Sequence, residues 1–201
     1  MIVRKLFGAA FAGEKLTANA TTNSTTRTTE EIHDFIEVGI ESKFLELARE
    51  KGFEKIVSIQ NPYSLLNRIY EVGLAEISQH ENVGLLAYSP LGFGQLTGKY
   101  IDKTDKHSRL GLYGDWFTRY SNDRCLDAVK QYAEIAKNHD LSLTHLSLAF
   151  VNLQPFVTSN IIGATTMEQL RENIESVDIN LSDEIIEEIN QVHENQPNPA
   201  P

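Results

Sequence analysis

The sequence predicts an α/β fold with about three parallel β-strands and surrounding helices. Three short apolar runs support this, because each lies between turn-forming residues and is flanked by helical patterns. These runs are Ile56–Gln60, Gly84–Tyr88 and Val157–Ile162. Buried strands that alternate with helices form parallel sheets with right-handed crossovers. A complete (β/α)8 barrel has eight strands and about 250 residues, so the chain has the strand–loop–helix order of that class without its strand count.

The composition is that of an ordinary soluble globular protein and argues against several classes of function. The chain has 201 residues, 41% of them hydrophobic and 23% charged, and a net charge of −10. An acidic surface disfavours nucleic-acid and membrane partners, and no apolar stretch is long enough to span a bilayer. The single cysteine, Cys125, cannot form an internal disulfide and fits a reducing compartment, so we expect a cytoplasmic protein. The six histidines lack metal-ligand spacing, so no metal site is expected.

The first 29 residues are predicted to form a disordered leader. After Leu16 the leader is a run rich in Thr, Asn and Ser with no apolar residue that could anchor it to a core, so it cannot offset the entropy of ordering. Ordered structure is expected from about Thr29. Residues 30–51 have helical spacing interrupted near Gly39, which predicts one or two helices, and Gly52 is a typical helix end.

The middle of the chain alternates helices with the first two strands. A helix is predicted over residues 65–78, and its expected inner side consists of Leu65, Leu66, Ile69, Val72 and Ile77. After the second strand, residues 101–122 form a connector that is long for a compact domain. Long connectors are commonly binding loops or lids.

The C-terminal part is predicted to contain four helices around the third strand. Two of them cover residues 124–139 and 143–153, and a last helix runs from 183 to about 195. The helix after the third strand begins at a capping box, Thr166 to Gln169, and its predicted buried stripe consists of Met167, Leu170, Ile174 and Val177. Residues 196–201 are predicted to be a frayed tail.

Two strand ends open into loops that suit an anionic ligand. Ser89-Pro90 is followed by Gly92, Gly94, Gly98 and Lys99, and glycines let a phosphate approach backbone N–H groups. Neither a Walker loop nor a G-x-G-x-x-G motif fits, because Phe93 and Thr97 occupy required glycine positions. A cofactor role and a plain strand-to-helix turn both remain open at this point. The second loop, 163–169, opens onto a capped helix N-terminus, where anions commonly bind.

From Ser42 onward the chain resembles the aldo-keto reductases, in particular the bacterial group similar to the potassium-channel beta subunits. The resemblance rests on SKFLELAREKG, VSIQNPYSLLNR, LLAYSPLGFGQLTGKY and IIGATTMEQLRENI, which occur in the family's order. Members of that family are barrels that reduce carbonyl compounds with NADPH. The resemblance therefore implies that residues 30–195 are the C-terminal half of a partial (β/α)8 TIM barrel.

The resemblance also implies a set of residues that bind NADP. Gln60 would bond the nicotinamide carboxamide and Tyr88 would stack on its ring. The phosphates would contact Ser89, Pro90, Leu91, Lys99 and Arg109. The adenosine end would contact Gly163, Thr165, Gln169, Glu172 and Asn173. Each residue also has a structural interpretation: Gln60 and Tyr88 as buried groups satisfied by the backbone, and Lys99 and Arg109 as solvated charges.

The family's catalytic tetrad has no counterpart here. Its Asp, Tyr, Lys and His come from early strands, and residues 1–41 contain neither a strand pattern nor such a set, so no proton donor can be assigned. We therefore expect a truncated homologue of an NADPH-dependent carbonyl oxidoreductase, without catalytic activity of its own. The alternative is a non-catalytic half-barrel that binds NADPH or docks on a partner, with exposed sheet edges that favour self-association. A third hypothesis is that the gene is longer and the chain arises from a frameshift or internal start.

Overall fold

The structure, a computed structural model, describes residues 29–101, 108–113, 116 and 118–201. Its centre is a three-stranded parallel sheet in the order β1-β2-β3. The strands are β1 (Ser58–Pro62), β2 (Gly84–Tyr88) and β3 (Val157–Ile161). The predicted α/β class with parallel strands is confirmed, and β2 has its predicted bounds.

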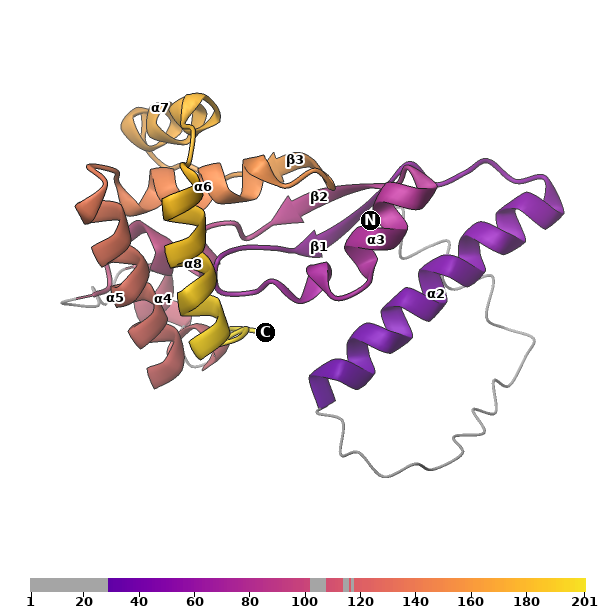
Figure 1. The fold of residues 1–201 in the computed structure, drawn as a ribbon, viewed down its shortest axis with the longest axis horizontal. Coiled ribbons are helices and arrows are strands. Elements are labelled where there is room, and N and C mark those ends of the chain that lie inside the picture. Colours follow the sequence, from indigo (N-terminus) through magenta and orange to yellow (C-terminus); the bar gives the residue numbers. More distant parts are fainter. Residues whose placement is uncertain (1–28, 102–107, 114–115, 117) are drawn as a thin grey trace.

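Helices connect and surround the strands (Figure 1). The α-helices are α2 (Thr29–Lys51), α3 (Leu74–Glu81), α4 (Arg109–Tyr113), α5 (Asp123–Asn138), α6 (Leu143–Leu153), α7 (Met167–Glu175) and α8 (Asp183–Asn195). The 3₁₀ helices are η1 (Ile69–Glu71), η2 (Gly92–Thr97), η4 (Thr118–Tyr120) and η5 (Ser176–Asp178). The last four α-helices each begin at a side-chain cap, and these caps are Asn122, Ser142, Thr166 and Ser182. Each cap accepts a bond from a backbone N–H of the first turn, so a local signal sets these starts.

The two faces of the sheet differ in their surroundings. Leu85 and Ala87 of β2 are fully buried and belong to the hydrophobic core. Side chains alternate between faces along a strand, so Leu86 and Tyr88 point the other way, where Tyr88 is exposed. Gln60, which pairs with Leu86, is exposed on the same face. One face therefore carries the core and the other stays open.

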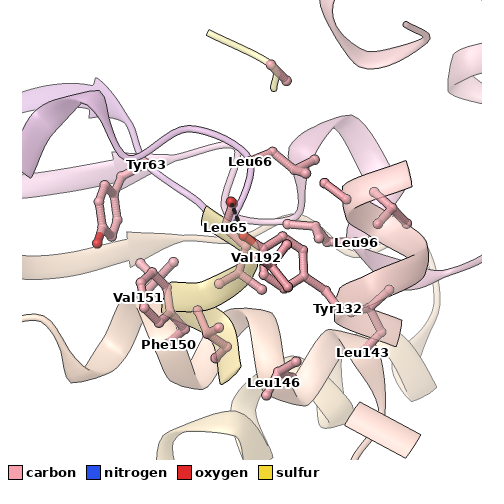
Figure 2. Close-up of a cluster of buried hydrophobic side chains, with 14 of the residues drawn as sticks. Tyr63, Leu65, Leu66, Leu96, Tyr132, Leu143, Leu146, Phe150, Val151 and Val192 are labelled. Carbon is pink, nitrogen blue, oxygen red and sulfur yellow. Dashed lines mark hydrogen bonds between the residues drawn. The ribbon is translucent and has the colours of Figure 1, made fainter. Parts of the chain in front are cut away.

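The core lies where α5, α6 and α8 meet the residues that follow β1 (Figure 2). Tyr132 of α5 is fully buried, and its hydroxyl donates to the Leu65 carbonyl at 3.1 Å. Tyr63 stacks on Phe150 of α6 with ring centroids 6.1 Å apart. A tyrosine hydroxyl in an apolar core requires a hydrogen-bond partner, and the Leu65 carbonyl is that partner for Tyr132.

The predicted helix over residues 65–78 is wrong in its first half. A Ser64–Asn67 bridge and η1 precede α3, which begins only after Gly73. Gly73 has φ 118°, a conformation that no helix allows and that side chains rarely adopt. The break turns Val72, expected on the inner side, out to solvent.

The predicted break near Gly39 is also wrong, because α2 runs through it as one helix. Leu45 and Ala48 on this helix are buried, and Arg49 bonds Glu81 at the end of α3. A glycine inside a helix costs about 1 kcal/mol relative to alanine, which does not end a long helix. The leader predicted for 1–29 lies outside the described residues except for Thr29.

The C-terminal tail is tied to the core instead of frayed, contrary to the prediction. Asn198 Oδ1 accepts a bond from the Arg68 N–H at 2.8 Å, and the Ala200 N–H donates to the Leu66 carbonyl at 3.1 Å. Ala200 is 1% exposed. The proline content predicted a tail without regular structure, but individual hydrogen bonds fix the tail to the core.

We expect the free energy of unfolding to decrease as the pH falls, because of the protonation of His193 on α8. Burial and, to a lesser degree, the Arg68 charge lower the pKa of this imidazole below 6.5. The folded state thus binds the proton less readily than the unfolded state, so its stability is complete above about pH 6.5 and is lost as the pH falls through the lowered folded value. Urea titrations from about pH 7.5 to 5 should show a smaller loss in His193→Gln than in the wild type. His80→Gln, at an exposed site on α3, is the matched control; an unchanged pH slope in His193→Gln would contradict the expectation.

Among the helices that the structure describes, none combines the length and the apolar character needed to cross a membrane.

Candidate cofactor site

A pocket of about 810 Å³ lies at the carboxyl ends of β2 and β3. One wall is the loop after β2 with η2, and the opposite wall is the loop after β3 with α7. The N-terminal end of α6 and the start of α4 complete the lining. Ligands of parallel α/β sheets bind at this end of the strands.

The loop after β2 holds an unusual backbone. Ser89 and Phe93 have φ of 55° and 61°, in the left-handed region, although neither is a glycine. Gly92, Gly94 and Gly98 also have positive φ. Such conformations cost free energy in residues with a Cβ atom and cluster at ligand sites. The bond from the Gly92 N–H to the Ser89 carbonyl, at 2.9 Å, closes the turn.

A stack of side chains carries Arg109 at the edge of the pocket. The Arg109 guanidinium lies 5.4 Å from the centre of the Phe93 ring. Phe93 in turn stacks on Tyr120, with centroids 5.5 Å apart and planes within 4°. Because Tyr120 is buried, the stack connects the cation to the core.

Lys99 is positioned by a second aromatic residue. Its ammonium lies 4.8 Å from the centre of the Tyr100 ring. Burial raises the pKa of Tyr100, but hydrogen bonds from Ser108 and the Leu110 N–H, together with Lys99, lower it below its ordinary value. A Cβ at Gly94 would lie 3.1 Å from Lys99 Cε, so this glycine leaves room for the lysine.

The loop after β3 is held by the first turns of α7. Gln169 Oε1 accepts bonds from the Thr165 N–H at 2.9 Å and from the Thr165 hydroxyl at 3.0 Å. Asn173 Nδ2 donates to the Gly163 carbonyl at 3.4 Å. The hydroxyl of Ser142, the cap of α6, donates to Glu172 Oε1 at 2.7 Å, which joins α7 to the N-terminal end of α6. The loop is therefore shaped before any ligand binds.

The structure brings together every sequence-predicted site residue except Gln60 and Tyr88. The residues that line the pocket are Ser89, Pro90, Leu91, Lys99, Arg109, Gly163, Thr165, Gln169, Glu172 and Asn173. Gln60 and Tyr88 lie outside that lining, on the open sheet face, and both are exposed. This overturns the interpretation of these two as buried groups satisfied by the backbone. The part that each residue plays in binding stays a prediction.

Sequence reasoning missed several residues of the pocket wall. These are Phe93, Gly94, Thr97, Ser108, Ser142, Thr144, Ile161, Ile162 and Ala164. Gly94 lies inside the glycine-rich loop, and Ile161 and Ile162 end the third predicted strand, so their positions were a usable signal. Ser142 and Thr144 lie at a capped helix start that signals no ligand, and only the packing of α6 brings them here.

The donor set fits an anionic, nucleotide-sized ligand. The lining contains two cations, Lys99 and Arg109, and one carboxylate, Glu172, whose oxygen is already bonded to Ser142. Hydroxyl groups and isoleucine side chains supply polar and apolar contacts. The volume falls in the range of about 300–1,000 Å³ that is usual for cofactor and ligand sites. Fold and pocket thus define an α/β protein with a pocket at its strand ends that carries two cations.

The aldo/keto reductase family model matches residues 18–194. This chain belongs to the aldo-keto reductase family. The matched region begins before Ser42, the point from which motifs are recognisable by eye.

Known proteins, among them two named as reductases, are similar to the chain over most of its length. Protein Tas of Escherichia coli K12 is 50% identical over 159 residues, which cover 79% of this chain and 46% of that protein. An aldo-keto reductase of Babesia bovis is 37% identical over 75% of this chain and 56% of its own length. The L-glyceraldehyde 3-phosphate reductase of E. coli K12 is 31% identical over 67% of this chain and 40% of its own length. The chain thus spans about half the length of these relatives.

Proposed function

We propose that this chain binds NADPH in the pocket between the β2 and β3 loops and is the cofactor-binding part of a carbonyl reductase. The observation that supports this is the convergence of residues from 89 to 173 around one pocket with two cations. Cations and helix N-termini at strand ends are the usual partners of phosphate groups. Assignment to the group similar to the potassium-channel beta subunits, preference for NADPH over NADH, and a cytoplasmic location are part of the same proposal.

Each wall would hold one end of the cofactor. Lys99 and Arg109 would neutralise the phosphates, and Thr165 with Gln169 would hold the adenosine end. When bound, NADPH supplies the hydride for a carbonyl carbon. Tyr88 and Gln60 on the open face of the sheet would lie toward the nicotinamide.

Tyr63, which follows β1, is unsuited to proton transfer to the substrate oxygen. Tyr63 is fully buried, and its hydroxyl donates to Glu71. Burial and the Glu71 charge raise the pKa of Tyr63 far above its ordinary value. A general acid needs a proton that it can release near the operating pH. We therefore propose cofactor binding without turnover by this chain alone.

Titration with NADPH tests the proposal. The purified chain should enhance or shift NADPH fluorescence with saturation. Lys99→Ala should weaken binding by about tenfold or more, because it removes one charge-assisted contact of about 1.5–3 kcal/mol. Lys130→Ala, at an exposed site on α5, is the control. An absent fluorescence change at saturating NADPH would refute binding, and reduction of methylglyoxal that a substitution in this chain abolishes would refute the absence of turnover.

Phe93→Ala should weaken NADPH binding about two- to fivefold. The ring holds the Arg109 guanidinium, and such a cation–π contact is worth about 0.5–1 kcal/mol. Phe93→Tyr keeps an aromatic face and should bind as the wild type does. Fluorescence titration at two salt concentrations checks this: equal affinity of Phe93→Ala and wild type would show that the stack does not position Arg109.

A second candidate function is a half-barrel that docks on a partner, and the exposed edges of the sheet favour it. The outer edges of β1 and β3 pair with no other strand among the described residues.

A further inference from the structure

We propose that Asn152, near the C-terminal end of α6, is a positioning residue for the adenosine end of the cofactor. Asn152 is not among the residues that line the pocket. It acts by holding α7 in the place from which Gln169 and Asn173 shape the loop after β3. The identity of the ligand rests on the proposed function, whereas the hold of Asn152 on α7 can be measured without a ligand.

A chain of hydrogen bonds runs from β3 through α6 to α7. Asn160 Nδ2 of β3 donates to Asn152 Oδ1 at 3.1 Å, and Asn152 Nδ2 donates to the Ser176 hydroxyl at 3.3 Å. The Ser176 hydroxyl donates in turn to the Asn173 carbonyl of α7 at 2.7 Å. All three bonds point in the same direction, so each group polarises the next one and strengthens its bond.

The first member of this chain is only partly satisfied. Asn160 Oδ1 is buried and has no hydrogen-bond partner among the described residues. A buried amide with an unpaired oxygen costs free energy. Stability alone therefore does not account for Asn160, and the bond that its Nδ2 makes to Asn152 does.

The side of α7 and η5 that is buried is polar, and the prediction of a buried apolar stripe is wrong. Met167, Ile174 and Val177 are 73%, 56% and 66% exposed, whereas Asn173 and Ser176 are buried. An amphipathic helix normally buries its apolar side. Apolar packing of the predicted stripe thus does not set the orientation of α7, and polar bonds to its neighbours do.

Helix α6 holds α7 at two places along its length (Figure 1). At the N-terminal end of α6, the Ser142 hydroxyl bonds Glu172 Oε1, and His145 Nε2 lies 3.1 Å from the Glu172 carbonyl oxygen. At the other end, Asn152 bonds Ser176. Ser142 and Glu172 line the pocket themselves, so Asn152 is the contact that can be changed without altering the pocket wall.

The position of α7 is transmitted to the pocket by two side chains. Gln169 Oε1 accepts bonds from the N–H and the hydroxyl of Thr165, and Asn173 Nδ2 donates to the Gly163 carbonyl. Both bonds connect α7 to the loop that would hold the adenosine end. Groups that bind a ligand must be held by their supporting contacts to within about 0.5 Å. A shift of α7 therefore moves this loop and leaves the loop after β2 in place.

Two fragments of the cofactor test this split by isothermal titration calorimetry. Asn152→Leu keeps a similar volume and removes both bonds. It should weaken the binding of adenosine 2′,5′-bisphosphate about fivefold or more, the factor that one ordinary hydrogen bond contributes. The affinity for reduced nicotinamide mononucleotide should stay within about twofold of the wild type, because this fragment meets the other wall.

Ser147→Ala is the matched control. It removes a fully buried hydroxyl from the same helix, but this hydroxyl bonds the Leu143 carbonyl of α6 itself. Both fragments should bind this variant as they bind the wild type. Circular dichroism checks that each variant is folded, and Ser176→Ala, which breaks the same chain at its next bond, takes the place of Asn152→Leu if that variant unfolds.

Hydrogen exchange without ligand gives a second measurement. In Asn152→Leu the amides of residues 163–175 should exchange faster than in the wild type, because α7 has lost its hold. The amides of residues 89–99, in the loop after β2, should exchange at the same rate in both proteins. Local opening of one segment is visible in this way without global unfolding.

Two results with the fragments would overturn the positioning role. One is equal affinity of Asn152→Leu and the wild type for adenosine 2′,5′-bisphosphate. The other is an equal loss for both fragments, which would show a general loosening of the fold. A wild type that binds neither NADPH nor the adenosine fragment would refute the proposed function and the assignment of the ligand. Unchanged exchange in residues 163–175 would overturn the hold of Asn152 on α7, whatever the chain binds.

Discussion

Replacing Phe150 by alanine should lower the free energy of unfolding by about 3–5 kcal/mol, the usual cost of removing a buried phenylalanine. Phe150 is 2% exposed at the centre of the core on α6 (Figure 2). It stacks on Tyr63, and the Arg68 guanidinium lies 5.0 Å from its ring centre. Truncation would leave a cavity and remove the aromatic ring that contacts the largely buried Arg68 guanidinium.

Urea denaturation followed by circular dichroism measures this loss. Leu153→Ala on the same helix is the matched control, since Leu153 is largely exposed and a surface change usually stays within about 0.5 kcal/mol. A loss below about 1 kcal/mol for Phe150→Ala would mean that the core does not depend on this ring.

Arg68→Met should cost about 2–3 kcal/mol, because it leaves Glu71 without its cation. Removing one partner of a buried pair costs about 3–5 kcal/mol, and partial exposure of Glu71 reduces this. Arg68 Nε donates to Glu71 Oε1 at 2.7 Å, and Nη2 donates to Oε2 at 2.9 Å. A third bond joins Nη1 to Asn190 of α8 at 2.9 Å. Burial lowers the pKa of Arg68, but the bonds and charge of Glu71 raise it above its ordinary value, so the guanidinium stays charged throughout the working range.

The double variant Arg68→Met/Glu71→Met separates the pair from its surroundings. Replacing both charged partners by apolar groups is often close to neutral, so the double variant should regain much of the stability that the single variant loses. Thermal and urea unfolding of the wild type, Arg68→Met, Glu71→Met and the double variant gives the coupling free energy. Additive losses would show that the two side chains act independently and that the geometry of this pair contributes nothing.

Much of the fold could be predicted because its signals are local. The run Gly84–Tyr88 is apolar and bounded by turn residues, and it is a strand with those bounds. Thr166 and Ser182 bond the backbone N–H groups within their own first turns. Part of the site could be predicted for a related reason. Ser89 to Leu91 and Gly163 to Thr165 follow strand ends, and parallel strands place those ends side by side.

The features that could not be predicted depend on contacts between distant segments. Gln60 and Tyr88 belong to strands that were correctly expected, but only the sheet shows that their face is open. The tail residue Asn198 is ordered by a bond to Arg68, which lies far away in the sequence. No local sequence pattern predicts either feature.

The sequence alone determined β2 and the last four α-helices, because spacing, caps and turn residues act over a few positions. It also determined the apolar stripe of α7. The tertiary structure decided that this stripe faces outward, because the bonds of Asn173 and Ser176 orient the helix against α6 and the pocket loop. Amphipathic spacing shows that a helix has an apolar side, but burial of that side requires a packing partner in the right place.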